Sequence, residues 1–188
     1  MVVIDATMLM VILRPDVAPS ADPGGVKIDH PRERIEFLVQ ELERAKTKII
    51  VPTPALSEVL VRAGPAASQQ IIEQLNKHAV FRIEPFDTRA AIEVAAMTRN
   101  AIDSGNKKGN TAATWTKIKY DRQIVAIAKV CGATAIYSDD RDIRNIAKLV
   151  NIKVIGLADL PVPEEARQLG LPFSGDVHAK DETDEGGA

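Results

Sequence analysis

Short apolar runs rich in β-branched residues alternate along this chain with longer stretches of helical periodicity. Crossovers of a dozen or more residues, usually helical, are what parallel neighbouring strands require. The alternation therefore predicts an α/β fold, a three-layer sandwich in which helices flank a central, mainly parallel sheet. The expected strands are VVIDA at 2–6, KIIVP at 48–52, VFRIEPF at 80–86, ATAIY at 133–137 and KVIGL at 153–157.

Proline, glycine and capping residues indicate where the helices begin and end. Thr53 is expected to cap the helix that Gly64 ends, and Asp87 to cap the next long helix. Asp121 follows a polar segment and is expected near the start of its helix. The expected helices span residues 31–46, 53–64, 65–78, 88–105, 121–132 and 142–150.

Two segments lack this periodicity. Residues 15–30, PDVAPSADPGGVKIDH, are rich in Pro, Gly and Asp and predict a long loop insertion. Residues 161–188 carry a net charge of −5 and residues 1–160 carry +3. We therefore expect one domain over residues 1–160, followed by an acidic, disordered tail over 161–188.

Composition excludes several classes of protein. A single cysteine, Cys131, rules out an internal disulfide framework and suits a reducing compartment. No apolar run approaches the roughly 20 residues that span a bilayer, and the start lacks the basic region of a secretory signal. Neither a phosphate-binding P-loop nor a nucleophile elbow occurs. These features predict a cytoplasmic protein without a membrane segment.

Acidic residues fall near the carboxyl ends of several expected strands. The carboxyl ends of parallel strands share one edge of a sheet, where ligands bind, so these side chains are expected to converge. Convergent carboxylates repel one another unless a cation neutralises them. An oxygen-only donor set favours Mg²⁺ or Mn²⁺. The candidate ligands are Asp5, Glu58, Asp121, Asp140 and Asp142.

Each of these residues also has an ordinary structural interpretation. Asp121 and Asp142 could be helix N-caps, and Glu58 could be an exposed helix residue. Asp139 is expected to be exposed or to support a ligand. Thr7 and Ser138 could orient water, phosphate or a carboxylate, or only make turn hydrogen bonds. The sequence leaves these alternatives open.

Basic and aromatic residues interleave between residues 107 and 122. Basic side chains attract phosphates, and aromatic faces stack on unpaired bases. The alternative is a solvated loop whose tryptophan packs on the body of the protein. The predicted RNA contacts are Trp115, Lys117, Lys119 and Arg122.

Four stretches in order make the chain resemble the PIN domain family: VIDAT, PALSEVLVR, YDRQIVAIAKVCGATAIYSDDRDI and VIGLADL. The resemblance covers roughly residues 1–160. It implies a PIN-like fold whose site acids fall on Asp5, Glu58, Asp121 and Asp140. Asp142 matches a further acid that many members carry, and Thr7 matches a small hydroxyl residue.

The resemblance also implies an activity. PIN domains of the VapC-like kind are metal-dependent ribonucleases, and many are toxins of toxin–antitoxin pairs. We therefore expect a Mg²⁺- or Mn²⁺-dependent endoribonuclease that leaves 5′-phosphate and 3′-hydroxyl ends. Its partners would be RNA, an antitoxin protein and a second copy of the chain.

Two other classes of function remain open. A catalytically silent PIN fold would serve as a binding module for RNA or a protein partner. Phosphoryl-transfer proteins also gather carboxylates at the end of a parallel sheet, but Asp5 lacks the second Asp two residues later that such phosphatases use.

Overall fold

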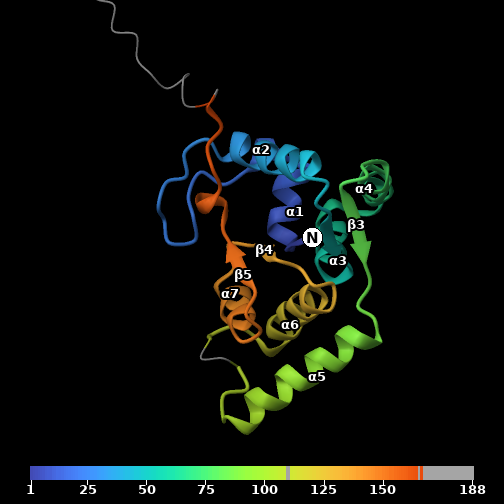
Figure 1. Ribbon diagram of the computed structural model, residues 1–188, viewed down its shortest axis with the longest axis vertical. Helices are drawn as coiled ribbons and strands as arrows, with labels where there is room; N and C mark the ends of the chain where they lie inside the picture. Colours follow the sequence, from blue (N-terminus) through green and yellow to red (C-terminus); the bar gives the residue numbers. More distant parts are fainter. Residues whose placement is uncertain (109–110, 165, 167–188) are drawn as a thin grey trace, which may run out of the picture.

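A five-stranded sheet forms the centre of the computed structural model, which describes residues 1–108, 111–164 and 166 (Figure 1). The strands are β1 (Val2–Ile4), β2 (Ile49–Pro52), β3 (Phe81–Glu84), β4 (Ala135–Tyr137) and β5 (Lys153–Ile155). Their order is β3-β2-β1-β4-β5, and every adjacent pair is parallel. The predicted α/β class with a parallel sheet is confirmed.

Helices cover both faces of the sheet. They are α1 (Ala6–Leu13), α2 (Pro31–Arg44), α3 (Thr53–Ala63), α4 (Pro65–Lys77), α5 (Thr88–Asp103), α6 (Trp115–Val130) and α7 (Arg141–Lys148), with short 3₁₀ turns η1 (Pro15–Val17) and η2 (Leu157–Asp159). Helices α1 to α4 lie on one side of the sheet and α5 to α7 on the other, which gives the three layers (Figure 1). Among the described residues, no helix is both long and apolar enough to cross a membrane.

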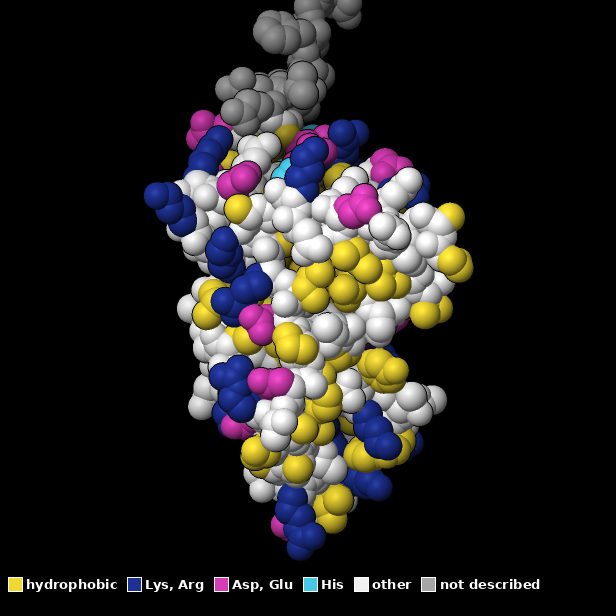
Figure 2. Space-filling view, turned by 90° about the vertical axis from the view of Figure 1, so that its right-hand side faces the viewer, with side chains coloured by type: hydrophobic (Ala, Val, Ile, Leu, Met, Phe, Trp, Pro, Cys, Tyr) yellow, Lys and Arg dark blue, Asp and Glu magenta, His cyan; other side chains and the backbone are white. Residues whose placement is uncertain are grey.

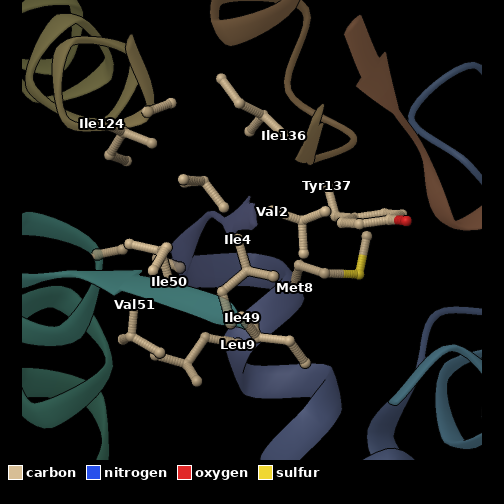
Figure 3. Packing of buried hydrophobic residues seen from close by; sticks show 14 of the residues in the cluster. Val2, Ile4, Met8, Leu9, Ile49, Ile50, Val51, Ile124, Ile136 and Tyr137 are labelled. Atoms are coloured by element: carbon tan, nitrogen blue, oxygen red, sulfur yellow. The ribbon is translucent and has the colours of Figure 1, made fainter. Parts of the chain in front are cut away.

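The central strands β1, β2 and β4 are apolar because both faces of the sheet are covered, whereas the edge strands β3 and β5 contain Arg82, Glu84 and Lys153. Ile4, Ile50 and Ile136 are fully buried at the centre. Leu9 of α1 and Ile124 of α6 belong to the same hydrophobic cluster (Figure 3). Burying one such side chain stabilises the fold by about 1.5–3 kcal/mol. This buried sheet fixes where each strand ends, and therefore where the residues that follow it lie.

Helix α1 is missing from the sequence prediction. Its residues, ATMLMVIL, are apolar all round, so they show no amphipathic period. The helix begins directly after β1 because Asp5 caps it, with Oδ1 accepting a hydrogen bond from the Met8 N–H at 2.7 Å. Asp5 thus ends a strand and starts a helix at the carboxyl edge of the sheet.

The predicted start of α6 is wrong, and the Asp142 cap that the sequence left open for α7 does not form. Helix α6 begins at Trp115, six residues before Asp121, because Thr114 caps it by accepting a hydrogen bond from the Lys117 N–H at 3.2 Å. Asp121 therefore lies in the second turn of α6 and is not its cap. Asp140, not Asp142, caps α7, accepting from the Asp142 N–H at 2.7 Å.

Thr53 is likewise not an N-cap. It is the first residue of α3, and Pro52 precedes it in the cap position without a side-chain hydrogen bond. The Thr53 hydroxyl instead accepts from the Phe86 N–H at 3.0 Å, which ties α3 to the segment after β3.

The segment 15–30 forms the expected long loop. It contains η1 and one antiparallel bridge between Ala21 and Lys27. Arg34 of α2 connects the end of this loop to η2 and the residue after it, donating to the carbonyl oxygens of Asp29, Ala158 and Leu160. The predicted disorder of the acidic tail concerns residues 161–188, of which 165 and 167–188 lie outside the described residues. The division into a domain and a tail stays a prediction.

Candidate metal centre

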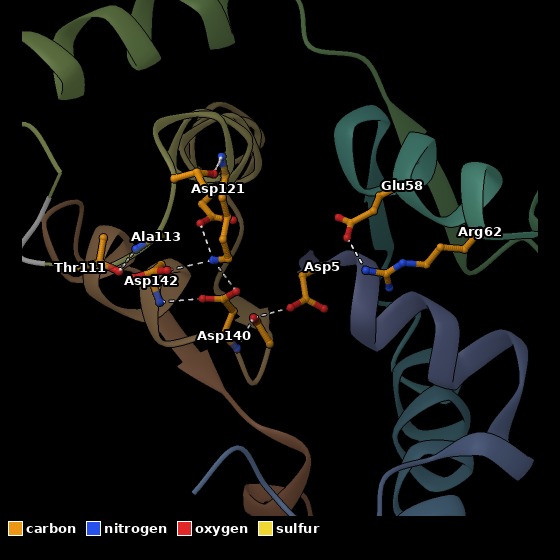
Figure 4. Close-up of polar contacts among 11 residues, drawn as sticks. Asp5, Glu58, Arg62, Thr111, Ala113, Asp121, Asp140 and Asp142 are labelled. Carbon is orange, nitrogen blue, oxygen red and sulfur yellow. Dashed lines mark hydrogen bonds and ion pairs between the residues drawn. The ribbon is translucent and has the colours of Figure 1, made fainter.

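Three aspartates meet at the carboxyl edge of the sheet, between α6 and α7. Asp121 projects from α6, Asp140 caps α7 and Asp142 lies in the first turn of α7. One carboxylate oxygen from each lies within 4.8 Å of the others (Figure 4). Oxygen atoms this close repel one another unless a positive charge lies among them.

Lys117 supplies that positive charge. Its Nζ lies 2.9 Å from Oδ2 of Asp121, 2.7 Å from Oδ2 of Asp140 and 2.9 Å from Oδ2 of Asp142. Lys117 precedes Asp121 by four residues on α6, so both side chains project from the same face of the helix. The three carboxylates of the cluster therefore share one ammonium group.

The pKa values of this group reflect burial and mutual contact. Partial burial by itself lowers the pKa of Lys117, but hydrogen bonds to the three aspartates outweigh it and raise the pKa above its usual range. At Asp142 burial favours the neutral acid, yet hydrogen bonds from Lys117 and Thr111 outweigh it and lower the pKa. At Asp121 burial prevails over Lys117 and raises the pKa to about 6.

Asp5 lies beside this cluster and is linked to it through Ser138. The Ser138 hydroxyl donates to Asp5 Oδ2 at 2.5 Å and accepts from the Asp140 N–H at 3.0 Å. With Oδ1 bound to the Met8 N–H, both oxygens of the Asp5 carboxylate have a donor. Burial nevertheless raises the pKa of Asp5 to about 6. Asp5 is therefore held in one orientation and protonates more readily than an exposed aspartate.

Glu58 points from α3 toward the side of the aspartates (Figure 4), but its carboxylate is paired with Arg62 and not with their cluster. Its Oε1 lies 2.6 Å from Nη2 of Arg62 on the next turn of α3, and both side chains are about half exposed, 47% and 51%. Figure 4 places this pair across from Asp121 and Asp140. Exposed pairs of this kind contribute only about 0–1 kcal/mol, so Glu58 can rotate at little cost.

A cleft of about 510 Å³ opens between these two groups. Asp5 and Asp140 lie at its floor, α3 and α6 form its walls, and Asp142 lies just outside it, beside a second hollow between α5, α6 and α7. The predicted site residues that line the cleft are Asp5, Thr7, Glu58, Lys117, Asp121 and Asp140. The fold thus brings most of the predicted site to one cavity.

The sequence itself decides the family. A family model described as the PIN domain matches residues 28–149, which is more than half of the chain. The chain belongs to the PIN domain family. The matched segment contains Glu58, Asp121, Asp140 and Asp142 but begins after Asp5. Asp5 joins the site because β1 lies between β2 and β4 in the sheet.

Solved structures share this PIN fold over nearly their whole length. The structure of FitAB bound to an IR36 DNA fragment has a TM-score of 0.55 at 16% identity, covering 86% of this chain and 98% of that one. VapBC2 from Rickettsia felis, bound to a DNA fragment from its promoter, has a TM-score of 0.55 at 10% identity, covering 82% and 97%. DNA-bound VapBC from Salmonella typhimurium has a TM-score of 0.51 at 13% identity, covering 83% of this chain and 97% of that one. No curated protein matches the sequence.

Asp139 differs from the other acids of the turn after β4. Its Oδ1 accepts a hydrogen bond from the Leu157 N–H at 2.9 Å, so the side chain holds the segment after β5. A Cβ at Gly156 would lie 2.5 Å from the same oxygen, which explains why a glycine stands there. Asp139 is thus partly buried and binds the backbone of η2, whereas the sequence predicts that it is exposed or supports a ligand.

Trp115 is surrounded by cationic side chains. Lys107 Nζ lies 4.4 Å, Arg122 Cζ 5.3 Å and Lys119 Nζ 5.5 Å from its ring centroid. Arg122 is buried, and its guanidinium donates to the Thr98 hydroxyl and the Lys107 carbonyl at 3.0 and 2.8 Å. Its guanidinium is thus turned inward, so the prediction that Arg122 contacts RNA is not supported.

Basic side chains do not form one continuous surface on the face shown in Figure 2. Hydrophobic side chains gather in the middle of that face, and Lys and Arg are dispersed around them, several beside an Asp or Glu (Figure 2). Lys119 is exposed and lies two residues, about half a helical turn, from Lys117 on α6. RNA contact by Lys119 and Trp115 remains a prediction.

The role of Lys117 inside the cluster is missing from the sequence analysis. The signal that would reveal it is the four-residue spacing to Asp121, which matters only if both residues are helical. The predicted helix started at Asp121 and so excluded Lys117. The pairing of Glu58 with Arg62 has the same four-residue spacing. The sequence does not predict it because the side-chain rotamers decide whether the two groups meet.

Proposed function

We propose that this PIN domain is a divalent-cation-dependent endoribonuclease. The observation that carries the proposal is the set of three carboxylates, Asp121, Asp140 and Asp142, that already share one cationic group. The nuclease character of the family supports the same conclusion.

The donor set suits Mg²⁺ or Mn²⁺. The cluster offers carboxylate oxygens alone, which hard divalent cations prefer, and no histidine or cysteine of the described residues belongs to it. The ligands would be Asp121, Asp140 and Asp142, with Asp5 adjacent to Asp140 through Ser138. When bound, the cation would lower the pKa of water and stabilise negative charge on a phosphate.

The chain's own residues would position the substrate. Asp5, held by Met8 and Ser138, presents a fixed negative charge at the floor of the cleft. Arg62 lines the opposite wall and would bind a phosphate oxygen, since a guanidinium suits that geometry. Glu58, released from Arg62, would then be free to interact with the bound cation or the substrate. Thr7 at the rim would hydrogen-bond the strand or water.

The biological role that we propose is that of a toxin with an antitoxin partner. The solved structures that share the fold are FitAB and VapBC assemblies on DNA, and VapBC and FitAB are toxin–antitoxin systems. The same proposal includes a homodimer and a cytoplasmic location.

The test is cleavage of a labelled RNA by the purified full-length chain. We expect product with Mg²⁺, none with EDTA, and none from Asp121→Asn in Mg²⁺. Asp103→Asn is the matched control, because Asp103 is an exposed α5 residue paired with Arg99. Full cleavage by Asp121→Asn would overturn the assignment.

A silent binding module is the second candidate. The observation that favours it is that Lys117 already pairs with the aspartates and Glu58 is already paired with Arg62. It predicts retention of RNA on the protein without any metal-dependent product, so the same assay separates the two candidates.

A further inference from the structure

Lys117 lies where a bound cation would lie. Its Nζ contacts Oδ2 of each of three carboxylates at 2.7–2.9 Å, and each carboxylate has an oxygen within 4.8 Å of one from each of the others. A divalent cation bound by these carboxylates would draw on the same oxygens that now hold the ammonium group. The space between them admits one positive centre, so the ammonium and a divalent cation cannot share it.

We infer that Lys117 is a built-in counter-ion that occupies the cation position in the metal-free protein and must leave it when a divalent cation binds. The inference rests on the proposed metal dependence. Metal binding is then an exchange of one cation for another, and not the filling of an open site. Lys117 lowers the affinity for metal because the three carboxylates lose its contacts when the metal enters.

The surroundings of Lys117 permit this exchange. Its side chain is 41% exposed, whereas that of Asp121 beneath it is 8% exposed. The ammonium group ends a flexible four-carbon chain, and the cleft that Lys117 lines gives it room to move. The carboxylates, by contrast, are fixed: Asp140 caps α7 and Asp121 is buried. Lys117 is therefore the movable member of the group.

The charges around the cluster set the direction of the effect. Together the three aspartates and Lys117 carry a formal charge of −2, and the Glu58–Arg62 pair across the cleft adds none. Without Lys117 the cluster would carry −3, which attracts a divalent cation more strongly. Removing the ammonium should therefore tighten metal binding.

The experiment is a calorimetric titration of the full-length protein with Mn²⁺, without RNA. The variants are Lys117→Met, which keeps the length of the side chain, and Lys119→Met as the matched control. Lys119 carries the same charge two residues away, is exposed and contacts Trp115, not the aspartates.

We expect the Kd for Mn²⁺ to fall at least about tenfold in Lys117→Met, because a unit charge in contact with the ligands is removed. In Lys119→Met the Kd should stay within about twofold, since exposed charges are screened. If the wild type binds Mn²⁺ and Lys117→Met binds it no more tightly, the inference fails while the proposed function stands. If none of the proteins binds Mn²⁺, both fail.

A measurement on the wild type alone covers the case in which Lys117→Met does not fold. The Lys117 ¹⁵Nζ resonance, assigned through its side-chain carbons, reports whether the ammonium stays with the aspartates. We expect this resonance to shift or exchange out in step with Mg²⁺ binding, while that of Lys119 changes little. A Lys117 resonance that is unchanged at saturating Mg²⁺ would contradict the exchange.

Discussion

The two walls of the cleft hold carboxylates in different ways. On the α6–α7 wall, three aspartates lie within 4.8 Å of one another and share the ammonium of Lys117. On the α3 wall, Glu58 is paired with Arg62 of the same helix, and both side chains are about half exposed. The first arrangement depends on residues far apart in the sequence, and the second on neighbours along one helix.

The difference separates a fixed part of the site from an adjustable part. Asp140 is bound by its capping hydrogen bond, and its N–H donates to Ser138, which in turn holds Asp5. These contacts fix the carboxylates before any ligand arrives, which is what electrostatic stabilisation of a reaction requires. Glu58 has no such support, so it can change partner when the substrate or cation enters.

The largest effect should follow from Asp140→Asn on the fixed wall. Asparagine is as good an N-cap as aspartate, so α7 should remain. The negative charge at the cation site is lost, and we expect RNA cleavage to fall by at least about 10³-fold, since ligand charge supplies several kcal/mol of stabilisation. Initial rates in Mg²⁺ measure the loss, with circular dichroism to verify the fold.

Asp139→Asn is the control for this change, because it alters the adjacent acid in the same turn. Asp139 binds the Leu157 N–H, not the cation site, and Asn can accept the same bond. A loss of cleavage as large as that of Asp140→Asn would mean that the turn as a whole, and not Asp140, carries the activity.

The second effect is the pH dependence of stability in the metal-free protein. Burial raises the pKa of Asp5 from 3.8 to about 6, so the folded state binds a proton more tightly than the unfolded chain. This contribution is fully present below about pH 4 and is lost as the pH rises to about 6. The corresponding free energy is on the order of 3 kcal/mol.

Urea unfolding in EDTA between pH 4 and 7 measures this contribution. The substituted side chain of Asp5→Asn cannot titrate. Between pH 4 and 7 the free energy of unfolding of this variant should therefore fall by roughly 3 kcal/mol less than that of the wild type. Asp121, whose pKa is also raised to about 6 by burial, should leave a residual slope in the variant. Identical slopes for both proteins would show that Asp5 is not buried as described.

Most of the fold could be predicted from the sequence, and the elements that could not be predicted have physical causes. The central strands β1, β2 and β4 are buried on both faces, so each appears as a continuous apolar run. Helix α1 is also apolar all round and gives no period to detect. The start of α6 lies in a polar stretch, and Thr114, its cap, resembles any loop threonine until its hydrogen bond is known.

The site was accessible only in part. The acids could be found because they follow strands that share one edge of the sheet. The contacts of Lys117 and Glu58 could not, because each depends on a side-chain rotamer and, for Lys117, on where α6 begins. Sequence thus indicates which residues reach the cleft, whereas the structure determines which of them touch.

The third effect is a change in the free energy of unfolding on loss of the hydrogen bond between Asp139 and Leu157, which lies outside the cleft. Asp139→Ala removes the acceptor of the half-buried Leu157 N–H, and we expect a loss of about 1–3 kcal/mol in the free energy of unfolding. Cleavage per folded molecule should change little.

Gly156→Ala should lower the free energy of unfolding by a similar amount, because its Cβ would lie 2.5 Å from Asp139 Oδ1. Urea unfolding measures the stability of both variants, and unchanged stability in both would show that the contact between Asp139 and Leu157 does not stabilise the fold.

The smallest effect belongs to the α3 wall. Glu58→Gln removes an exposed partner of Arg62, so the free energy of unfolding should change by less than about 1 kcal/mol. Cleavage should fall only about tenfold, far less than for Asp140→Asn, because Glu58 must first leave Arg62 to take part. Arg62→Met frees Glu58 and should leave the fold intact while weakening RNA binding, measured as a higher KM. If Glu58→Gln instead abolished cleavage as completely as Asp140→Asn, both walls of the cleft would be equally necessary for the reaction. The Glu58 rotamer that pairs with Arg62 would then occur only in the protein without substrate.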